Sequence, residues 1–169
     1  MNSHSIGKIF LHLSWVLVLA GLIMLFNQLI SRKTNPNQNP DSQTQNGVTE
    51  VILRRNSQHH YVANGLINGK SVTFLVDTGA TNVSIGANLA EKLGLKRGYQ
   101  GTAYTANGTT TTYATTLATL SLGDIQFNNV RASITMGMQG DEVLLGMSAL
   151  KDVELIHKNG ELTMRQYAQ

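Results

Sequence analysis

The chain has 169 residues, of which 41% are apolar and 14% charged, enough for one folded domain with an appended segment and unlike a disordered chain or a coiled coil. Cysteine is absent, which excludes disulfide scaffolds, thiolate metal sites and cysteine nucleophiles. The net charge is +3, but from Val48 onward 10 Lys and Arg stand against 9 Asp and Glu, which gives +1. A domain this close to neutral gives no electrostatic reason to expect a nucleic-acid partner.

The longest apolar run extends from Ile9 to Ile30 and contains no Asp, Glu, Lys or Arg. A helix of about 20 such residues crosses the hydrocarbon core of a bilayer, so residues 9–30 are predicted to form a transmembrane helix after an N-terminal flank, residues 1–8. A cleaved signal sequence is the alternative, although the run does not end in the small residues that a cleavage site needs. Cations flank both ends of the run, so charge leaves the orientation open.

Residues 31–47 contain almost no apolar side chain and include both prolines of the chain, Pro36 and Pro40. Such a composition cannot bury enough apolar surface to offset the loss of chain entropy. The sequence therefore predicts a flexible polar linker over residues 31–47, followed by a single folded domain over residues 48–169.

The sequence predicts an all-β domain. Short runs of Val, Ile, Leu and Thr alternate with Gly and with Asn-Gly pairs that begin at residues 64, 68, 107 and 159. Asn-Gly favours tight hairpins, since both residues tolerate positive φ. The expected hairpins are His60–Ile67 with Lys70–Val76, Tyr99–Ala106 with Thr109–Leu117, and Val153–His157 with Leu162–Gln166. Further strands are expected at Leu117–Leu122 and Ile125–Thr135, with short helices at Ala87–Leu93, ended by Gly94, and from Ser148.

The main candidate for chemistry is the acid of the tripeptide Asp77-Thr78-Gly79, which follows the apolar end of a predicted strand. An acid at the end of a buried strand is costly unless it is hydrogen-bonded or paired. A hard cation would need several oxygen ligands, and no other acid occurs between residues 70 and 88. Acid–base chemistry is therefore favoured over metal binding.

A lone carboxylate is a weak base at neutral pH, whereas two carboxylates held about 3 Å apart share one proton. One of the two can then activate water while the other protonates a substrate carbonyl. The tripeptide also fits a plain turn, in which Asp and Thr cap backbone groups and Gly adopts a positive φ. The three residues alone leave both interpretations open.

The wider pattern resembles the retropepsin-like aspartic proteases, and within them the bacterial membrane-anchored branch. The resemblance covers most of the chain from Val48 onward. Its motifs occur in the family's order: the catalytic loop Asp77-Thr78-Gly79-Ala80-Thr81, the run Val83-Ser84-Ile85, a short helix with Leu93-Gly94-Leu95, a hairpin at Asn107 in the place of the flap, and the second signature Leu144-Leu145-Gly146. It implies an all-β, single-lobe acid protease barrel with one or two short helices.

The resemblance also implies roles for individual residues. Asp77 would be the catalytic acid, and Thr78 would hydrogen-bond across a two-fold axis. The other expected positions are Gly79, Ala80 and Thr81, whose backbone groups would hold the peptide, Asn107 and Gly108, which would close over it, and the strand with Leu144, Leu145 and Gly146, which would pass beside the catalytic loop with the glycine permitting close approach.

No second Asp-Thr-Gly or Asp-Ser-Gly occurs in the chain, so activity is expected to need a homodimer that pairs Asp77 with Asp77 of the second copy. The leading hypothesis is a membrane-anchored aspartic endopeptidase acting on polypeptides. The resemblance to the bacterial branch implies that it lies in the inner membrane with its domain in the periplasm. The alternative is a non-catalytic dimeric module that binds peptides or serves as a scaffold. No cofactor or metal is expected, and the adjacent His59 and His60 would point to opposite faces of a strand.

Overall fold

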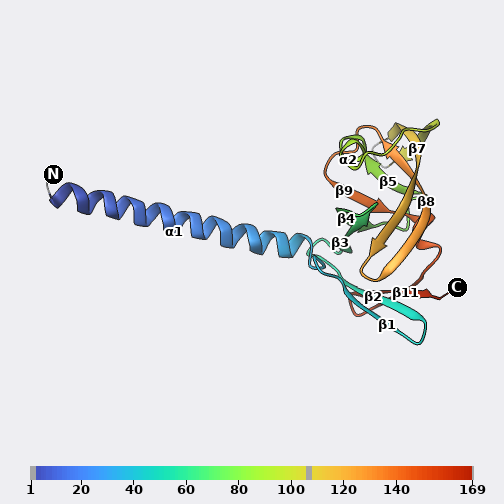
Figure 1. Cartoon of the computed structure of the whole chain (residues 1–169), viewed down its shortest axis with the longest axis horizontal. Coiled ribbons are helices and arrows are strands. Elements are labelled where there is room, and N and C mark those ends of the chain that lie inside the picture. Colours follow the sequence, from blue (N-terminus) through green and yellow to red (C-terminus); the bar gives the residue numbers. More distant parts are fainter. Residues whose placement is uncertain (1–2, 106–107, 169) are drawn as a thin grey trace.

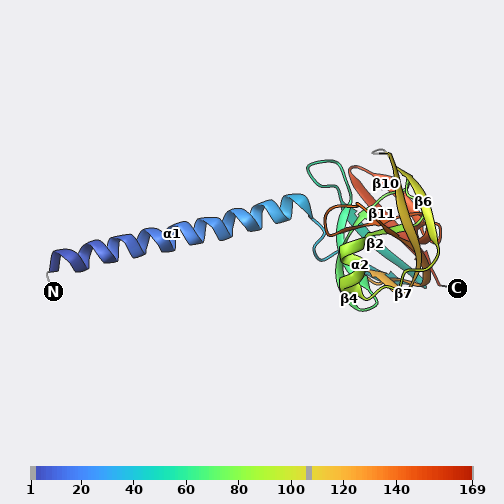
Figure 2. The same cartoon turned by 90° about the horizontal axis from the view of Figure 1, so that it is seen from above.

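The computed structural model describes residues 3–105 and 108–168 (Figure 1). A single long helix, α1 (Ser3–Thr34), extends away from a mostly β domain, and a view turned by 90° gives the same arrangement (Figure 2). The domain contains the strands β1 (Asp41–Gln45), β2 (Val48–Arg54), β3 (Val62–Ile67), β4 (Lys70–Val76), β5 (Val83–Gly86), β6 (Gln100–Thr105), β7 (Gly108–Leu122), β8 (Ile125–Thr135), β9 (Glu142–Leu145), β10 (Glu154–Lys158) and β11 (Glu161–Tyr167), with the short helices α2 (Ala87–Leu93) and α3 (Met147–Leu150).

The strands form two sheets. The larger has the order β3-β4-β9-β5-β8-β7-β6, and a further pairing of β3 with β7 closes most of it into a barrel. Within it β9 lies parallel to β4, while β5 lies parallel to β8. The smaller sheet has the order β1-β2-β11-β10 and is antiparallel throughout. The all-β barrel expected from the sequence is thus confirmed.

The core lies inside the barrel and under the smaller sheet. Strands β4, β5, β8 and β9 alternate buried and partly exposed positions, as strands with one face on a core do. The largest fully buried side chains are Phe74, Leu53, Ile67, Ile85, Leu117, Leu120, Leu122, Ile125, Ile134, Leu145, Leu150 and Met164. This packing fixes the ends of β4 and β9, from which the candidate site is built.

The predicted hairpins are confirmed, and the two whose turns lie within the described residues have the backbone geometry that Asn-Gly favours. Asn68 and Gly69 adopt φ of 49° and 76°, and Asn159 and Gly160 adopt 53° and 80°. Positive φ at both central residues is the type I′ geometry, which matches the twist of the flanking strands. The predicted helix at Ala87–Leu93 is α2, and it ends at Gly94 with φ of 76°.

One Asn-Gly pair does not form the turn that such pairs favour, and one strand boundary of the β prediction is wrong. Asn64-Gly65 forms no turn but lies inside β3, where a Cβ on Gly65 would stand 2.3 Å from the Ser121 carbonyl oxygen and 2.7 Å from the Phe74 ring. This glycine is needed for a close approach of strands rather than for turn geometry. Residues 109–122, expected as two strands that meet at Leu117, belong to the single long strand β7, which pairs with β8 from Thr112 to Leu122.

The predicted flexible linker over residues 31–47 also differs from the structure. Helix α1 continues through residues 31–34, and β1 pairs with β2 through a turn at Asn46 and Gly47. Between them, Asn35 and Asn37 are only 8% and 5% exposed. Composition suggested a tether because the segment lacks apolar residues, but its asparagines fold onto the domain through hydrogen bonds instead.

No described side chain of α1 belongs to the domain core. From Phe10 to Ile30 its large apolar side chains are exposed, including Leu17 at 73% and Met24 at 72%. Within the described residues, it is the one helix long and apolar enough to cross a membrane, over Phe10–Thr34. Such a helix near the N-terminus is either a membrane span or a signal sequence.

Candidate active site

Asp77 directly follows β4 and begins a tight loop. The Asp77 amide donates to the Leu145 carbonyl at 3.1 Å, and the Ala80 amide donates back to the Asp77 carbonyl at 3.2 Å. The Gly79 amide donates to the Asp77 carboxylate oxygen Oδ1 at 2.9 Å. The loop therefore holds the Asp77 carboxyl group in one orientation while the side chain stays partly exposed.

The close approach expected at the second signature is present in the structure. Val76 and Leu145 are partners in the parallel pairing of β4 with β9, and Gly146 follows directly. A Cβ on Gly146 would lie 2.3 Å from the Asn82 carbonyl oxygen and 2.7 Å from that of Ala80. Only a glycine fits there, because both obstructing atoms belong to the backbone.

The residues after Gly146 hold the far side of the loop. The Met147 amide donates to the Ala80 carbonyl at 2.8 Å, and the Ser148 amide donates to the Thr81 carbonyl at 3.0 Å. Thr78, Gly79 and Thr81 are themselves exposed. The backbone of the loop is thus bonded on both sides, while its outer edge faces solvent.

Ser148 has a structural role that its sequence neighbours do not reveal, because locally it indicates only the start of a helix. Its hydroxyl accepts a hydrogen bond from the Val83 amide at 2.9 Å and donates one to the Arg131 carbonyl at 2.7 Å. One side chain thereby connects the start of β5 with β8. A serine just after an apolar-apolar-glycine signature was the available signal, but its partners lie far away in sequence.

The hairpin of β6 and β7 was predicted to supply Asn107 and Gly108. Asn107 lies outside the described residues. Gly108 is exposed with φ of 104°, and the Thr105 hydroxyl donates to its carbonyl at 2.8 Å. Among the described residues, no hydrogen bond joins this hairpin to the Asp77 loop, so this chain brings together Asp77 and the second signature but not the hairpin end.

Charged groups away from Asp77 stabilise the smaller sheet. Arg165 on β11 and its cross-strand partner Glu50 on β2 form an ion pair in which the guanidinium Nε donates to the carboxylate. This hydrogen bond, with a second from Gln43, lowers the pKa of Glu50 below its usual value. Within the part of the chain that the structure describes, no three His, Asp or Glu side chains gather as metal ligands do, and His59 and His60 are both exposed.

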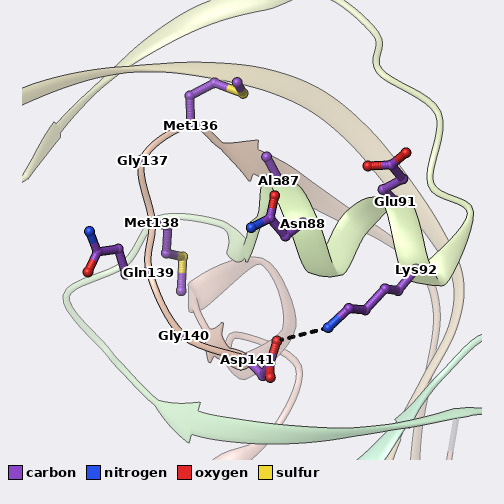
Figure 3. Close-up of a pocket in the computed structure, with 10 residues that line it drawn as sticks. All are labelled: Ala87, Asn88, Glu91, Lys92, Met136, Gly137, Met138, Gln139, Gly140 and Asp141. Carbon is purple, nitrogen blue, oxygen red and sulfur yellow. Dashed lines mark hydrogen bonds and ion pairs between the residues drawn. The ribbon is translucent and has the colours of Figure 1, made fainter.

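A pocket of about 860 Å³ lies between α2 and the loop that joins β8 to β9 (Figure 3). At its rim, Lys92 Nζ on the helix stands 3.5 Å from Asp141 Oδ1 on the loop, and both side chains are mostly exposed. Asp141 precedes β9, whereas Asp77 is bonded at the other end of that strand, so the pocket is separate from the Asp77 loop. Sequence patterns did not indicate it, because it arises from packing. It is lined by Ala87, Asn88, Glu91, Lys92, Met136, Gly137, Met138, Gln139, Gly140 and Asp141.

Comparisons with known proteins agree with this geometry. The model of the gag-polyprotein putative aspartyl protease family matches residues 63–152, which include both the Asp77 loop and β9. The crystal structure of a retropepsin-like aspartic protease from Rickettsia conorii superimposes with a TM-score of 0.59 at 31% identity, covering 68% of this chain and 97% of that one. The chain therefore belongs to the retropepsin-like aspartic protease family.

Two bacterial relatives extend the comparison. An uncharacterized protein from the cobV 5′ region of a Sinorhizobium species is 33% identical over 123 residues, which cover 70% of this chain and 53% of the relative. An uncharacterized protein of Rickettsia prowazekii is 31% identical over 123 residues, covering 71% of this chain and 52% of the relative. The chain thus spans about half the length of these relatives.

Proposed function

We propose that this protein is an aspartic endopeptidase whose catalytic acid is Asp77. The observation that carries the proposal is the placement of this carboxyl group. It lies at the end of a core strand, it is oriented by the Gly79 amide, and it is fastened to Leu145, in a chain that belongs to the aspartic protease family. A partly exposed acid held in this way is accessible to a substrate.

The proposed mechanism needs two carboxyl groups that share one proton. The ionised one takes a proton from water as the water oxygen attacks the peptide carbonyl carbon, and the protonated one gives its proton to the carbonyl oxygen. Collapse of the tetrahedral intermediate then breaks the C–N bond. The carboxyl group that took the proton from water gives it to the leaving nitrogen, while the other, now ionised, takes a proton from a hydroxyl of the intermediate. Peptide hydrolysis by this route consumes one water and requires no cofactor.

The second carboxyl group would come from Asp77 of another copy of the chain. The sequence contains one Asp-Thr-Gly, and the outer edge of its loop is exposed, with Thr78 and Gly79 both facing solvent. A two-fold homodimer that joins two such loops would bring the aspartates together. In that dimer Thr78 would bond across the axis, and the substrate would contact Gly79, Ala80 and Thr81, with Asn107 and Gly108 closing over it.

The proposed location is a bacterial inner membrane, crossed once by α1, with the protease domain in the periplasm. The exposed apolar surface of α1 and the basic residues Arg32 and Lys33 in its last turn support a retained span. Resistance of the full-length chain to extraction with alkaline carbonate would support this anchor. Recovery of a shortened soluble chain would instead indicate a cleaved signal sequence.

The test of the proposed activity is cleavage of a peptide library by the purified full-length chain, with Asp77→Asn as the matched control. The amide is nearly isosteric with the acid but cannot titrate, so we expect cleavage by the wild type and none by the variant, with equal folded content by circular dichroism. Equal cleavage by the wild type and by Asp77→Asn would show that Asp77 is not the catalytic acid. Peptide binding without cleavage by the wild type would favour a binding or scaffold module.

A further inference from the structure

The junction between α1 and the domain is a network of buried asparagines. The Asn37 side chain donates to the Arg54 carbonyl at 2.8 Å and to the Val62 carbonyl at 2.7 Å, and it accepts from the Arg54 amide at 2.7 Å. Its backbone bridges to Ala63 in β3. A single polar side chain thus binds the segment after the helix to both β2 and β3.

Three further asparagines extend this network to the helix itself. Asn35 Nδ2 donates to Asn64 Oδ1 at 2.8 Å, and Asn64 Nδ2 donates to the Gln38 carbonyl at 3.1 Å. Asn56 Nδ2 donates to the carbonyl of Thr34, the last residue of α1, at 3.0 Å. Because buried amides that lose their partners are costly, these bonds hold the end of the helix against the domain.

The same bonds lead from the end of α1 to the candidate catalytic loop. Asn56, which contacts Thr34, exchanges hydrogen bonds with His60: its amide donates to the His60 carbonyl at 2.8 Å, and its Oδ1 accepts from the His60 amide at 3.0 Å. The next residue, Tyr61, accepts from the Val76 amide at 2.9 Å. Asp77 follows Val76 directly.

This path limits the distance between the helix and the acid. Each hydrogen-bonded step between neighbouring chains spans about 5 Å, and each step along the chain spans about 3.8 Å. The path has three hydrogen-bonded steps and two chain steps, and one of the former passes through the longer Asn56 side chain, so Asp77 lies within roughly 25 Å of Thr34. The C-terminal end of the domain lies on the side away from α1 in both views (Figures 1 and 2), together with the β1–β2 turn, since the Ala168 amide bonds to the Gly47 carbonyl.

Helix geometry places the bilayer close to this junction. The apolar run ends at Ile30, and a rise of 1.5 Å per residue puts Thr34 about 6 Å beyond it. The polar headgroup layer is itself about 5–8 Å thick. No spacer therefore separates the membrane surface from the domain.

We propose that the asparagine network holds the Asp77 loop at a fixed, short height above the bilayer, so that the substrates are polypeptide segments next to a membrane anchor. This substrate class rests on the proposed protease activity and on α1 as a retained span. A protein anchored in the same bilayer presents its first residues at the height of Asp77. A cleavage site far from its anchor, or on a soluble peptide, lacks the gain in effective concentration that shared confinement provides.

The first experiment tests the placement of the Asp77 loop relative to the bilayer and does not depend on protease activity. Because the chain has no cysteine, single labels can be introduced by Thr78→Cys, beside Asp77, and by Gln45→Cys, near the β1–β2 turn. Both positions are exposed. In proteoliposomes with an energy acceptor on the lipid headgroups, we expect stronger transfer from the label at position 78 than from that at position 45. Equal transfer, or stronger transfer from position 45, would overturn the fixed placement.

A matched variant tests whether the junction sets the height. Insertion of about 12 Gly and Ser residues between Thr34 and Asn35 adds a flexible tether of roughly 20 Å while keeping every bond made by the Asn37 side chain. We expect transfer from position 78 to fall in this variant. The substitution Asn37→Ala should act in the same direction, whereas Asn39→Ala, at the exposed neighbouring asparagine, should leave transfer unchanged. Unchanged energy transfer from position 78 in the insertion variant would contradict a junction that sets the height of the domain.

The substrate class is tested with a sequence that the library shows to be cut in an Asp77-dependent manner. The sequence is placed about 10 or about 40 residues beyond the transmembrane segment of a reporter in the same liposomes. We expect the wild type to cut the near site about tenfold faster, and the insertion variant to lose this preference. Equal, Asp77-dependent cutting of both sites would overturn the substrate class but leave the protease intact. If no sequence is cut in an Asp77-dependent manner, the proposed protease activity itself is overturned, whatever the energy transfer shows.

Discussion

The Asp77 amide donates a hydrogen bond of 3.1 Å to the carbonyl of Leu145, a residue 68 positions later in the sequence. This bond continues the parallel pairing of β4 with β9 by one residue. It fastens the loop that carries the acid to a strand buried in the core. The position of the carboxyl group therefore depends on how closely β9 approaches the loop.

Replacement of Gly146 by alanine should destabilise the domain and displace the Asp77 loop. The added Cβ would meet the carbonyl oxygens of Asn82 and Ala80, and a backbone cannot move aside as a flexible side chain can. We expect a loss of about 1–3 kcal/mol in the free energy of unfolding, measured by denaturant titration of the full chain in detergent. Gly101→Ala is the control, because its Cβ would stand 3.4 Å from the Thr112 hydroxyl. Equal effects of the two variants would contradict the close approach.

Replacement of Ser148 by alanine should also weaken the site. The change leaves the Val83 amide without its partner in a partly buried position and also removes the exposed bond to the Arg131 carbonyl. We expect a loss of about 1–3 kcal/mol in the free energy of unfolding and faster hydrogen exchange at the Val83 amide. The exposed Ser71 serves as the control with Ser71→Ala. Unchanged protection at Val83 would show that the hydroxyl does not hold β5.

The proposed dimer makes a quantitative prediction for mixtures. If both aspartates are required, activity at constant total protein should fall with the square of the wild-type fraction as Asp77→Asn chains are added, because mixed dimers carry one native acid. Specific activity should also rise with concentration at low protein levels. A linear fall, with a monomer at all concentrations in sedimentation, would show that one chain suffices.

Acid should weaken the smaller sheet through Glu50. Its pKa is lowered in the folded state, chiefly by the hydrogen bond from Arg165. The stabilisation is therefore present above the unfolded pKa of about 4.3 and is lost as the pH falls through the lower folded value. We expect the Tm of the wild type to fall more between about pH 6 and about pH 3 than that of Glu50→Gln. Parallel falls in the two proteins would exclude this contribution, and added salt should reduce it.

Local patterns were sufficient for much of the fold. Asn68-Gly69 and Asn159-Gly160 predicted their hairpins because the preference for positive φ is a property of those residues themselves. The apolar face of α2 and the Gly94 that ends it are equally local. The order of motifs around Asp77 then pointed to the family, and the family and structural comparisons support it.

Tertiary structure decided the features whose causes lie far apart in the sequence. Gly65 and Asn64 look like a turn locally, but the carbonyl of Ser121 requires a glycine inside a strand. The segment with Asn35 and Asn37 looks like a tether because it has no apolar side chains, yet its partners are Arg54, Val62 and Asn64. The sequence by itself determined which residues favour turns, strands and an acid at a strand end. Only the packed chain decided where the polar groups find their partners, because a hydrogen bond depends on position in space and not on composition.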